Sequence, residues 1–229
     1  MNAKNVLNFI DNLSKNNNRE WFAANKEWYL EVQTDLLAFT EEWIKRLTEL
    51  EPEVAGLQPK DCLYRIYRDI RFSPNKLPYK NWLGIYIAKR GGKKSLYGGY
   101  YLHLQPGACM FAGGVWCPEP ELLKALRQDI YDNADELEEI FARPEVSKYL
   151  QDFDTYSTLK TVPASFRQKN PDFDPAWQHA DWLKLKTFTF SCPLTDKMVQ
   201  KPDFIDILMQ MCRAGKPLND FLNYTVENL

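Results

Sequence analysis

A short stretch in the first third of the chain holds the side chains that are best suited to chemistry. Three arginines recur within seven positions, Arg65, Arg68 and Arg71, and two lysines, Lys76 and Lys80, follow them. An arginine presents a planar fork of donors that matches a carboxylate or a phosphate, whereas a lysine offers a mobile point charge. Residues of these types at this density predict a site for a small anion that carries phosphate or carboxylate.

The element expected to position these groups is a strand over residues 62–69, which is rich in aromatic and β-branched residues and lacks Gly and Pro. Side chains alternate across a strand, so Arg65, Tyr67 and Asp69 share one face, and Arg71 joins them if the strand runs that far. Three charges on one face suit a surface that is wet or lines a cleft. Asp69 is expected to orient one of the arginines.

A turn is expected after this strand, because Ser, Pro and Asn follow one another and a second proline comes four positions later. An alternative interpretation pairs Asp69 with a neighbouring arginine in a structural network and leaves the lysines solvated. Arg68 lies on the opposite strand face and can be structural. The predicted ligand-binding residues are Arg65, Tyr67, Arg68, Asp69, Arg71, Ser73, Lys76, Tyr79 and Lys80.

Positive charge is concentrated between residues 60 and 94, where ten Lys and Arg stand against two Asp, although the whole chain has a net charge of −2. Such asymmetry is evidence about partners. One alternative function is contact with nucleic acid through the basic loops, with Tyr67 or Tyr79 stacking on bases. The net charge does not favour it, because nucleic-acid-binding domains are usually basic overall. A structural or protein-interaction domain without a ligand is the other alternative.

For catalysis, the sequence offers Asp69 and His103 as the plausible proton carriers. The competing interpretation of His103 is a hydrogen-bonded histidine of a sheet. Five scattered cysteines show no metal-ligand spacing, and Cys62 comes nearest to a reactive thiol because its neighbourhood is basic. We predict no metal site. The sequence identifies no cofactor and leaves open whether the protein is an enzyme.

Three stretches of the chain resemble an uncharacterised family, the domain of unknown function 2461. Two of them are the Asn-Arg-Glu-Trp-Phe run at residues 18–22 and the glycine-bounded run at residues 99–107. The third is the central motif, in which this chain has Ile70 where many relatives are expected to carry Thr. The resemblance implies a single α+β domain and no established activity. The central motif that carries it comprises Arg65, Tyr67, Arg68, Asp69, Arg71, Phe72, Ser73, Lys76, Pro78, Tyr79 and Lys80.

The fold predicted from the patterns is α+β, with an antiparallel sheet of about five strands packed against N-terminal and C-terminal helices. Residues 1–229 are expected to form one domain, in which 1–52 are N-terminal helices, 60–117 an antiparallel meander, and 118–229 mainly helical with one late strand. The strands are expected at 62–69, 83–88, 100–105, 108–112 and 186–192. The main helices are expected at 2–13, 17–50, 202–213 and 217–227, the second of them beginning with a capping box of Asn17 and Glu20.

Composition sets the broad class. With 229 residues, 45% of them hydrophobic, the chain can bury a sizeable core. No run approaches the ~18 consecutive apolar residues of a transmembrane helix, so we expect no membrane partner and a cytoplasmic location. The sequence does not fix the identity of the ligand or the oligomeric state.

Overall fold

The computed structural model describes residues 1–71 and 73–229. The chain divides into two compact units. Unit 1 consists of Met1–Ser95, Tyr100–Ala112 and Pro193–Gln210, and unit 2 of Leu96–Gly99, Gly113–Cys192 and Met211–Leu229. The single domain expected from the sequence stays a prediction.

The fold is α+β and contains an antiparallel sheet of four strands in the order β1-β2-β3-β4. The strands are β1 Leu83–Ile87, β2 Gly99–Leu104, β3 Cys109–Val115 and β4 Phe188–Leu194. β1 and β2 pair antiparallel with Leu83 opposite Leu104 and Ile85 opposite Leu102. Both pairs are buried, because alternate side chains of each strand face the core.

The prediction of five strands was wrong by one, because residues 62–69 do not form a strand. This segment leaves a short helix, α4 (Pro59–Cys62), and touches the sheet through a single bridge between Leu63 and Ile85. Beyond that bridge it turns away from β1 and pairs with residues 78–80 instead. Pro78 has no N–H to donate, which prevents this second pairing from extending into a regular ladder.

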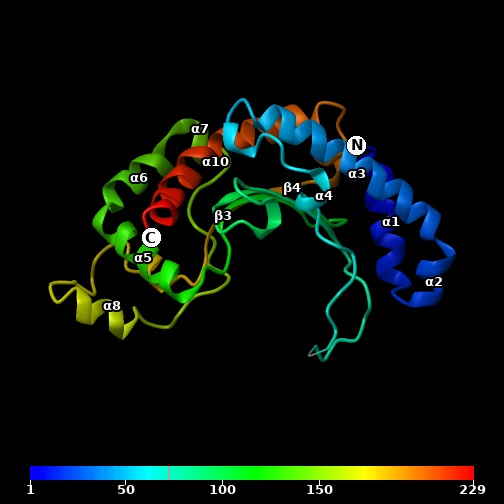
Figure 1. Cartoon of the computed structure of the whole chain (residues 1–229). Helices are drawn as coiled ribbons and strands as arrows, with labels where there is room; N and C mark the ends of the chain where they lie inside the picture. Colours follow the sequence, from blue (N-terminus) through cyan, green and yellow to red (C-terminus); the bar gives the residue numbers. More distant parts are fainter. Residues whose placement is uncertain (72) are drawn as a thin grey trace. The chain divides into compact units, whose positions relative to one another are not determined.

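The resulting hairpin runs from Leu63 to Lys80. The amide of Arg68 donates to the carbonyl of Pro78 at 2.9 Å, and the amide of Lys80 donates to the carbonyl of Ile66 at 2.8 Å. Figure 1 shows this segment, in cyan to teal, leading away from α4 and returning to the sheet. Phe72, part of the predicted motif, lies outside the described residues.

Three N-terminal helices belong to unit 1: α1 (Ala3–Lys15), α2 (Arg19–Ala24) and α3 (Lys26–Leu47). They lie together in Figure 1, where they are coloured blue. The single helix expected over residues 17–50 is therefore two helices, separated at Asn25. Asn25 is the C-terminal cap of α2 and the N-terminal cap of α3, and its side-chain amide donates to the carbonyl of Trp21 at 2.8 Å, in competition with the backbone. Apolar residues such as Val32 and Trp43 of α3 are fully buried in the core of unit 1.

The other helical elements are η1 (Pro52–Val54), η2 (Gly92–Lys94), α5 (Pro120–Asp132), α6 (Ala134–Ala142), α7 (Pro144–Ser147), α8 (Ala164–Lys169), η3 (Trp182–Lys184), α9 (Asp196–Val199) and α10 (Phe204–Glu227). Within residues 1–71 and 73–229, none of the helices combines the length and the apolar composition that crossing a membrane requires. The cytoplasmic location stays a prediction.

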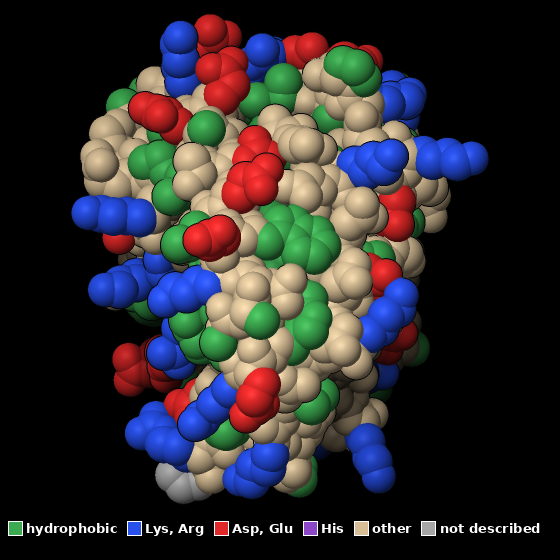
Figure 2. Space-filling view, turned by 90° about the vertical axis from the view of Figure 1, so that its right-hand side faces the viewer, with side chains coloured by type: hydrophobic (Ala, Val, Ile, Leu, Met, Phe, Trp, Pro, Cys, Tyr) green, Lys and Arg blue, Asp and Glu red, His purple; other side chains and the backbone are tan. Residues whose placement is uncertain are grey.

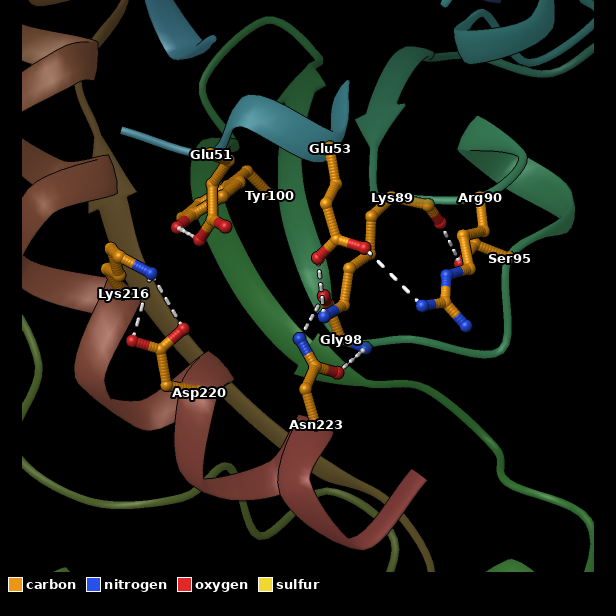
Figure 3. Close-up of polar contacts among 10 residues, drawn as sticks. All are labelled: Glu51, Glu53, Lys89, Arg90, Ser95, Gly98, Tyr100, Lys216, Asp220 and Asn223. Atoms are coloured by element: carbon orange, nitrogen blue, oxygen red, sulfur yellow. Dashed lines mark hydrogen bonds and ion pairs between the residues drawn. The ribbon is translucent and has the colours of Figure 1, made fainter. Parts of the chain in front are cut away.

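Helix α10 corrects a second expectation, since it is one helix where two were predicted. Pro217 lies inside it, and Gly215 does not end it. In unit 2 a Cβ atom on Gly215 would lie 2.9 Å from the ring of the buried Phe190, so the glycine serves close packing rather than termination. Later in the helix, Asn223 accepts from the amide of Gly98 at 2.7 Å and donates to its carbonyl at 3.1 Å (Figure 3).

Candidate functional site

Unit 1 contains a cavity of about 430 Å³ with four cationic side chains in its wall, Lys60, Arg65, Lys80 and Lys93, which we call the cavity cations. No Asp or Glu occurs among the lining residues that the structure describes. The remaining lining residues are Tyr29, Gln33, Leu36 and Leu37 of α3, together with Leu63, Tyr64 and Leu83.

Three segments bring the cavity cations together. Lys60 belongs to α4, and Lys93 belongs to η2, where its Nζ donates to the carbonyl of Lys60 at 2.8 Å. Arg65 and Lys80 stand on the two arms of the hairpin, near its base. The amide of Tyr64 donates to the carbonyl of Gly84 at 3.0 Å, which ties this base to β1. The opposite wall comes from α3, whose lining residues recur at helical spacing on one face.

Two aromatic rings flank the ammonium group of Lys80. Its Nζ lies 4.3 Å from the centroid of the Trp82 ring and 5.2 Å from that of Tyr64. These are cation–π distances, and such contacts stabilise a cation that has lost part of its hydration. Burial lowers the pKa of Lys80, and the nearby charge of Arg65 lowers it further. The Lys80 charge is therefore less well solvated than that of a free lysine.

None of the cavity cations forms a direct ion pair with a carboxylate among the described residues, although Arg65 lies near enough to Asp69 for its charge to help lower the pKa of that carboxyl. Among the residues that the structure describes, the ion pairs involve other cations, and none includes Lys60, Arg65, Lys80 or Lys93. Like charges around one hollow repel each other, and the repulsion grows where the surroundings exclude water. An anion in the cavity would be attracted by these cations and would offset the repulsion between them.

The four predicted charged residues nearer the tip of the hairpin form what we call the outer cluster, and they lie outside the cavity lining: Arg68, Asp69, Arg71 and Lys76. Arg71 forms a forked pair with Asp69, with Nη2 at 2.7 Å from Oδ2 and Nε at 3.0 Å from Oδ1. These hydrogen bonds lower the pKa of Asp69 to about 2. The Nζ of Lys76 donates to the carbonyl of Ile70 at 2.9 Å. The fourth contact is weaker, 3.5 Å from Nη2 of Arg68 to Oγ of Ser73.

The two predicted tyrosines have different surroundings. Tyr79 is buried and stacks on Phe22 of α2, with ring centroids 4.1 Å apart and an interplanar angle of 15°. The side chain of Asn17 forms two hydrogen bonds with the backbone of Tyr79, donating to its carbonyl at 3.0 Å and accepting from its amide at 3.1 Å. Tyr67 is 48% exposed beside the same Phe22 ring. The hairpin is thus anchored to the N-terminal run that carries the family resemblance.

A second, more open hollow of about 500 Å³ lies between this N-terminal run and the hairpin. Residues 17–20 line one side, and residue 70 with residues 75–78 lines the other. Its charges are mixed, because Glu20 lies beside Arg19 and Lys76. Figure 2 shows the side of the molecule that carries α1, α2 and α3, where basic and acidic side chains both occur with hydrophobic ones exposed between them. The unpaired positive charge is therefore a property of the first cavity.

His103 lies on β2 and has a hydrogen-bond partner for each ring nitrogen. The Tyr101 hydroxyl lies 2.8 Å from Nδ1, and Oε1 of Gln105 lies 3.1 Å from Nε2. Its ring packs against Trp82 with centroids 5.1 Å apart, and burial lowers the pKa of His103, which keeps it neutral at pH 7. Since the Gln105 oxygen only accepts, Nε2 carries the proton and Nδ1 accepts from the tyrosine. No hydrogen bond joins Asp69 to His103 among the described residues.

The surroundings of Cys62, the cysteine that the sequence placed nearest to a reactive thiol, are closed to solvent. Cys62 is buried, and burial raises the pKa of its thiol to about 11. At neutral pH this thiol stays protonated and is a poor nucleophile. Across residues 1–71 and 73–229, no three His, Cys, Asp or Glu side chains are grouped in a way that could hold a metal ion.

Sequence reasoning did not identify Lys60 and Lys93 as members of the site. They were counted in the positive excess, but nothing in their spacing shows that α4 and η2 come together. The wall from α3 also went unnoticed, although Gln33 interrupts an otherwise apolar series with Tyr29 and Leu36. A polar residue within a buried helical stripe is the signal that could have indicated a cavity there.

The chain belongs to the family described as "Conserved hypothetical protein (DUF2461)", whose model matches residues 5–221. The resemblance seen in the central motif is thereby confirmed. No curated protein and no solved structure matches this chain. The family description carries no activity, so the functional proposal depends on the cavity and its charges.

Proposed function

We propose that this protein binds a small anionic ligand, bearing phosphate or carboxylate, in the cavity of unit 1. The observation that carries the proposal is that four cations, Lys60, Arg65, Lys80 and Lys93, line one hollow whose described lining residues include no carboxylate. The forked guanidinium of Arg65 is suited to two parallel hydrogen bonds with such a group. The lysines add charge that adapts to its position.

The state of Lys80 supports the same proposal. Its ammonium is partly desolvated and repelled by Arg65, and both effects lower its pKa. A bound anion would favour the charged form and raise that pKa again. Binding at alkaline pH is therefore coupled to proton uptake by Lys80, and the affinity falls as Lys80 loses its proton.

The other predicted residues take secondary roles in the proposal. Tyr79 positions the hairpin through Phe22 and Asn17, so it acts on the cavity through the placement of Lys80. Tyr67, Arg68, Asp69, Arg71, Ser73 and Lys76 shape the hairpin outside the cavity lining. Asp69 and His103 stay candidates for proton transfer, and binding alone is proposed.

Calorimetric titration with inorganic phosphate and with citrate tests the proposal. Arg65→Met and Lys80→Met should each weaken binding by about tenfold or more, because a hydrogen bond to a charged group contributes roughly 1.5–3 kcal/mol. Two matched controls remove a lysine outside the lining: Lys76→Met on the hairpin and Lys94→Met beside Lys93. Both should stay within about twofold of the parent protein. Absence of binding by both anions, or equal losses in the controls, would overturn the proposal.

The nucleic-acid alternative has one observation in its favour, the exposed ring of Tyr67 beside the basic hairpin. It predicts binding of single-stranded DNA that weakens steeply with salt and depends on Tyr67 and Arg71. Binding of phosphate that depends on Arg65, without such binding of DNA, would exclude it. Failure of phosphate, citrate and DNA alike would leave an interaction domain as the better description.

A further inference from the structure

The cavity cations form two pairs at opposite ends of β1. Leu63 stands opposite Ile85 in an antiparallel bridge. Residues that follow Leu63, such as Arg65, therefore lie toward the start of β1, and residues that precede it, such as Lys60, lie toward its end. Lys80 comes three residues before the strand, and Lys93 comes six residues after it, in η2.

Contacts within each pair agree with this arrangement. Lys93 reaches the carbonyl of Lys60 at 2.8 Å, which places these two residues together. Arg65 and Lys80 lie close enough for the charge of one to lower the pKa of the other. One pair thus stands at the base of the hairpin, and the other stands where α4 meets η2.

One length describes the hollow along its α3 wall. Helix α3 lines the cavity from Tyr29 to Leu37, which corresponds to roughly 12 Å at about 1.5 Å per residue. Of β1, Leu83 at the start of the strand belongs to the lining. Together with the positions of the two pairs, this length indicates an elongated hollow.

The wall between the pairs is mainly apolar. Leu63 lies between Lys60 and Arg65 along the chain, and α3 contributes Leu36 and Leu37. Such a wall favours a hydrocarbon segment, because removing apolar surface from water is favourable. A compact anion such as phosphate would engage one pair and leave the apolar wall and the other pair without a partner.

We infer that the ligand is an elongated dianion, with an anionic group at each end and an apolar middle. A linear α,ω-dicarboxylate or a molecule with one carboxylate and one phosphate has this chemistry. The inference rests on the proposed function and specifies its ligand class. Arg65 and Lys80 bind one anionic end, and Lys60 and Lys93 bind the other.

Calorimetric titration with linear dicarboxylates of increasing chain length, each beside the monocarboxylate of equal length, tests this inference. Two linked binding groups gain affinity when the linker matches the span between their sites, and lose it when the linker is too short. We expect an optimum chain length at which the dicarboxylate binds about tenfold or more tighter than its monocarboxylate. Equal affinity of the two acids, or affinity that does not vary with length, would overturn the inference.

Variants at each end separate the two groups of cations. Lys80→Met and Lys93→Met should each reduce the affinity for the best dicarboxylate to the monocarboxylate level, whereas Lys94→Met should preserve the tenfold gain. Thermal unfolding checks that each variant is folded, and Lys93→Gln serves as a second substitution if the methionine variant is unstable. A loss at Lys80 without a loss at Lys93 would contradict a two-ended site.

Failure of the inference differs from failure of the proposed function. If phosphate and monocarboxylates bind in an Arg65-dependent manner and dicarboxylates gain nothing, a single-anion site stands and the dianion is excluded. If phosphate, monocarboxylates and dicarboxylates all fail to bind, the proposed function falls and takes the dianion with it.

Discussion

Two groups of basic residues on one hairpin differ in their surroundings. In the outer cluster, Arg71 is paired with Asp69 in a forked contact, and Lys76 is bound to a carbonyl. At the base of the same hairpin, Arg65 and Lys80 line a cavity whose described lining residues include no Asp or Glu. The residue types are alike, so the difference arises from the neighbours that the fold supplies.

This contrast teaches how a run of charges should be interpreted. Arg65 and Arg71 were both expected on one strand face, and both matched the same family motif. Asp69 neutralises the second within two residues, a contact that any extended chain can make. The first lines a cavity together with residues of α3 and α4, and the described lining residues include no carboxylate. Charge density in a sequence therefore locates a region, whereas packing decides which charges stay available.

The largest expected effect concerns the anchor that holds the base of the hairpin in place. Phe22→Ala removes the buried ring under Tyr79 and should lower the free energy of unfolding by about 3–4 kcal/mol. Urea denaturation measures the loss. The control Leu77→Ala removes an exposed side chain of the same hairpin and should cost less than about 0.5 kcal/mol. Equal costs for the two variants would mean that the stacked rings do not anchor the hairpin.

The second anchor is polar and should give a smaller effect. Asn17→Ala removes both hydrogen bonds to the backbone of Tyr79 and should cost about 1–2 kcal/mol, because a partly buried amide and carbonyl lose their partner. Asn12→Ala, which removes an exposed bond to the preceding helical turn, is the matched control and should cost less than about 0.5 kcal/mol. Chemical denaturation that ranks Asn12 above Asn17 would contradict this anchor.

The surroundings of Lys80 in the cavity predict a change in stability at alkaline pH. Lys80 should titrate below its ordinary pKa of 10.5, because burial and Arg65 disfavour the charged form. Folding thus opposes the charged lysine, so the penalty on stability is complete below the folded pKa and is relieved as the pH rises toward 10.5. NMR of the labelled lysine side chain follows the titration, and Arg65→Met should raise the midpoint. An unchanged midpoint would mean that the charge of Arg65 does not act on Lys80.

The outer cluster predicts the smallest effect, at the acid end. The pKa of Asp69 is lowered to about 2 from an ordinary value of 3.8 by its bonds to Arg71. The pairing contributes fully to stability above the ordinary value and is lost as the pH falls through the folded pKa. Carboxyl NMR shifts should show the low midpoint, and Arg71→Met should raise it toward 3.8, although the backbone amide of residue 71 and the charge of Arg65 still lower the pKa. A midpoint near 3.8 in the parent protein would mean that the pair is open in solution.

The sequence predicted those parts of the fold that local patterns control. Alternation located the strands at 83–88, 100–105 and 108–112 and the late strand at 186–192, and the class α+β is confirmed. The missing fifth strand shows the limit of the method. Residues 62–69 have the composition of a strand. They pair with residues 78–80 instead of β1, and Pro78 prevents that pairing from becoming a regular ladder. Composition does not reveal which segment a strand pairs with.

The candidate site was predictable in part for the same reason. Arg65 and Lys80 follow from residue type, and the cavity brings them together. Asn17 was expected to cap a helix, yet Asn18 is the cap and Asn17 binds Tyr79, which lies 62 residues further along the chain. Lys60 and Lys93 join the cavity through the packing of α4 against η2. Contacts between distant segments leave no local pattern, so only the folded chain reveals them.

The position of Lys80 over Trp82 has a practical consequence. The ammonium lies 4.3 Å from the centroid of the indole ring, so any event that draws this charge away alters the electric field that the indole experiences. Trp82 is thereby a built-in optical reporter of the cavity, readable by ultraviolet fluorescence without a dye. The difference in emission between the parent protein and Trp82→Phe isolates its signal from the other tryptophans.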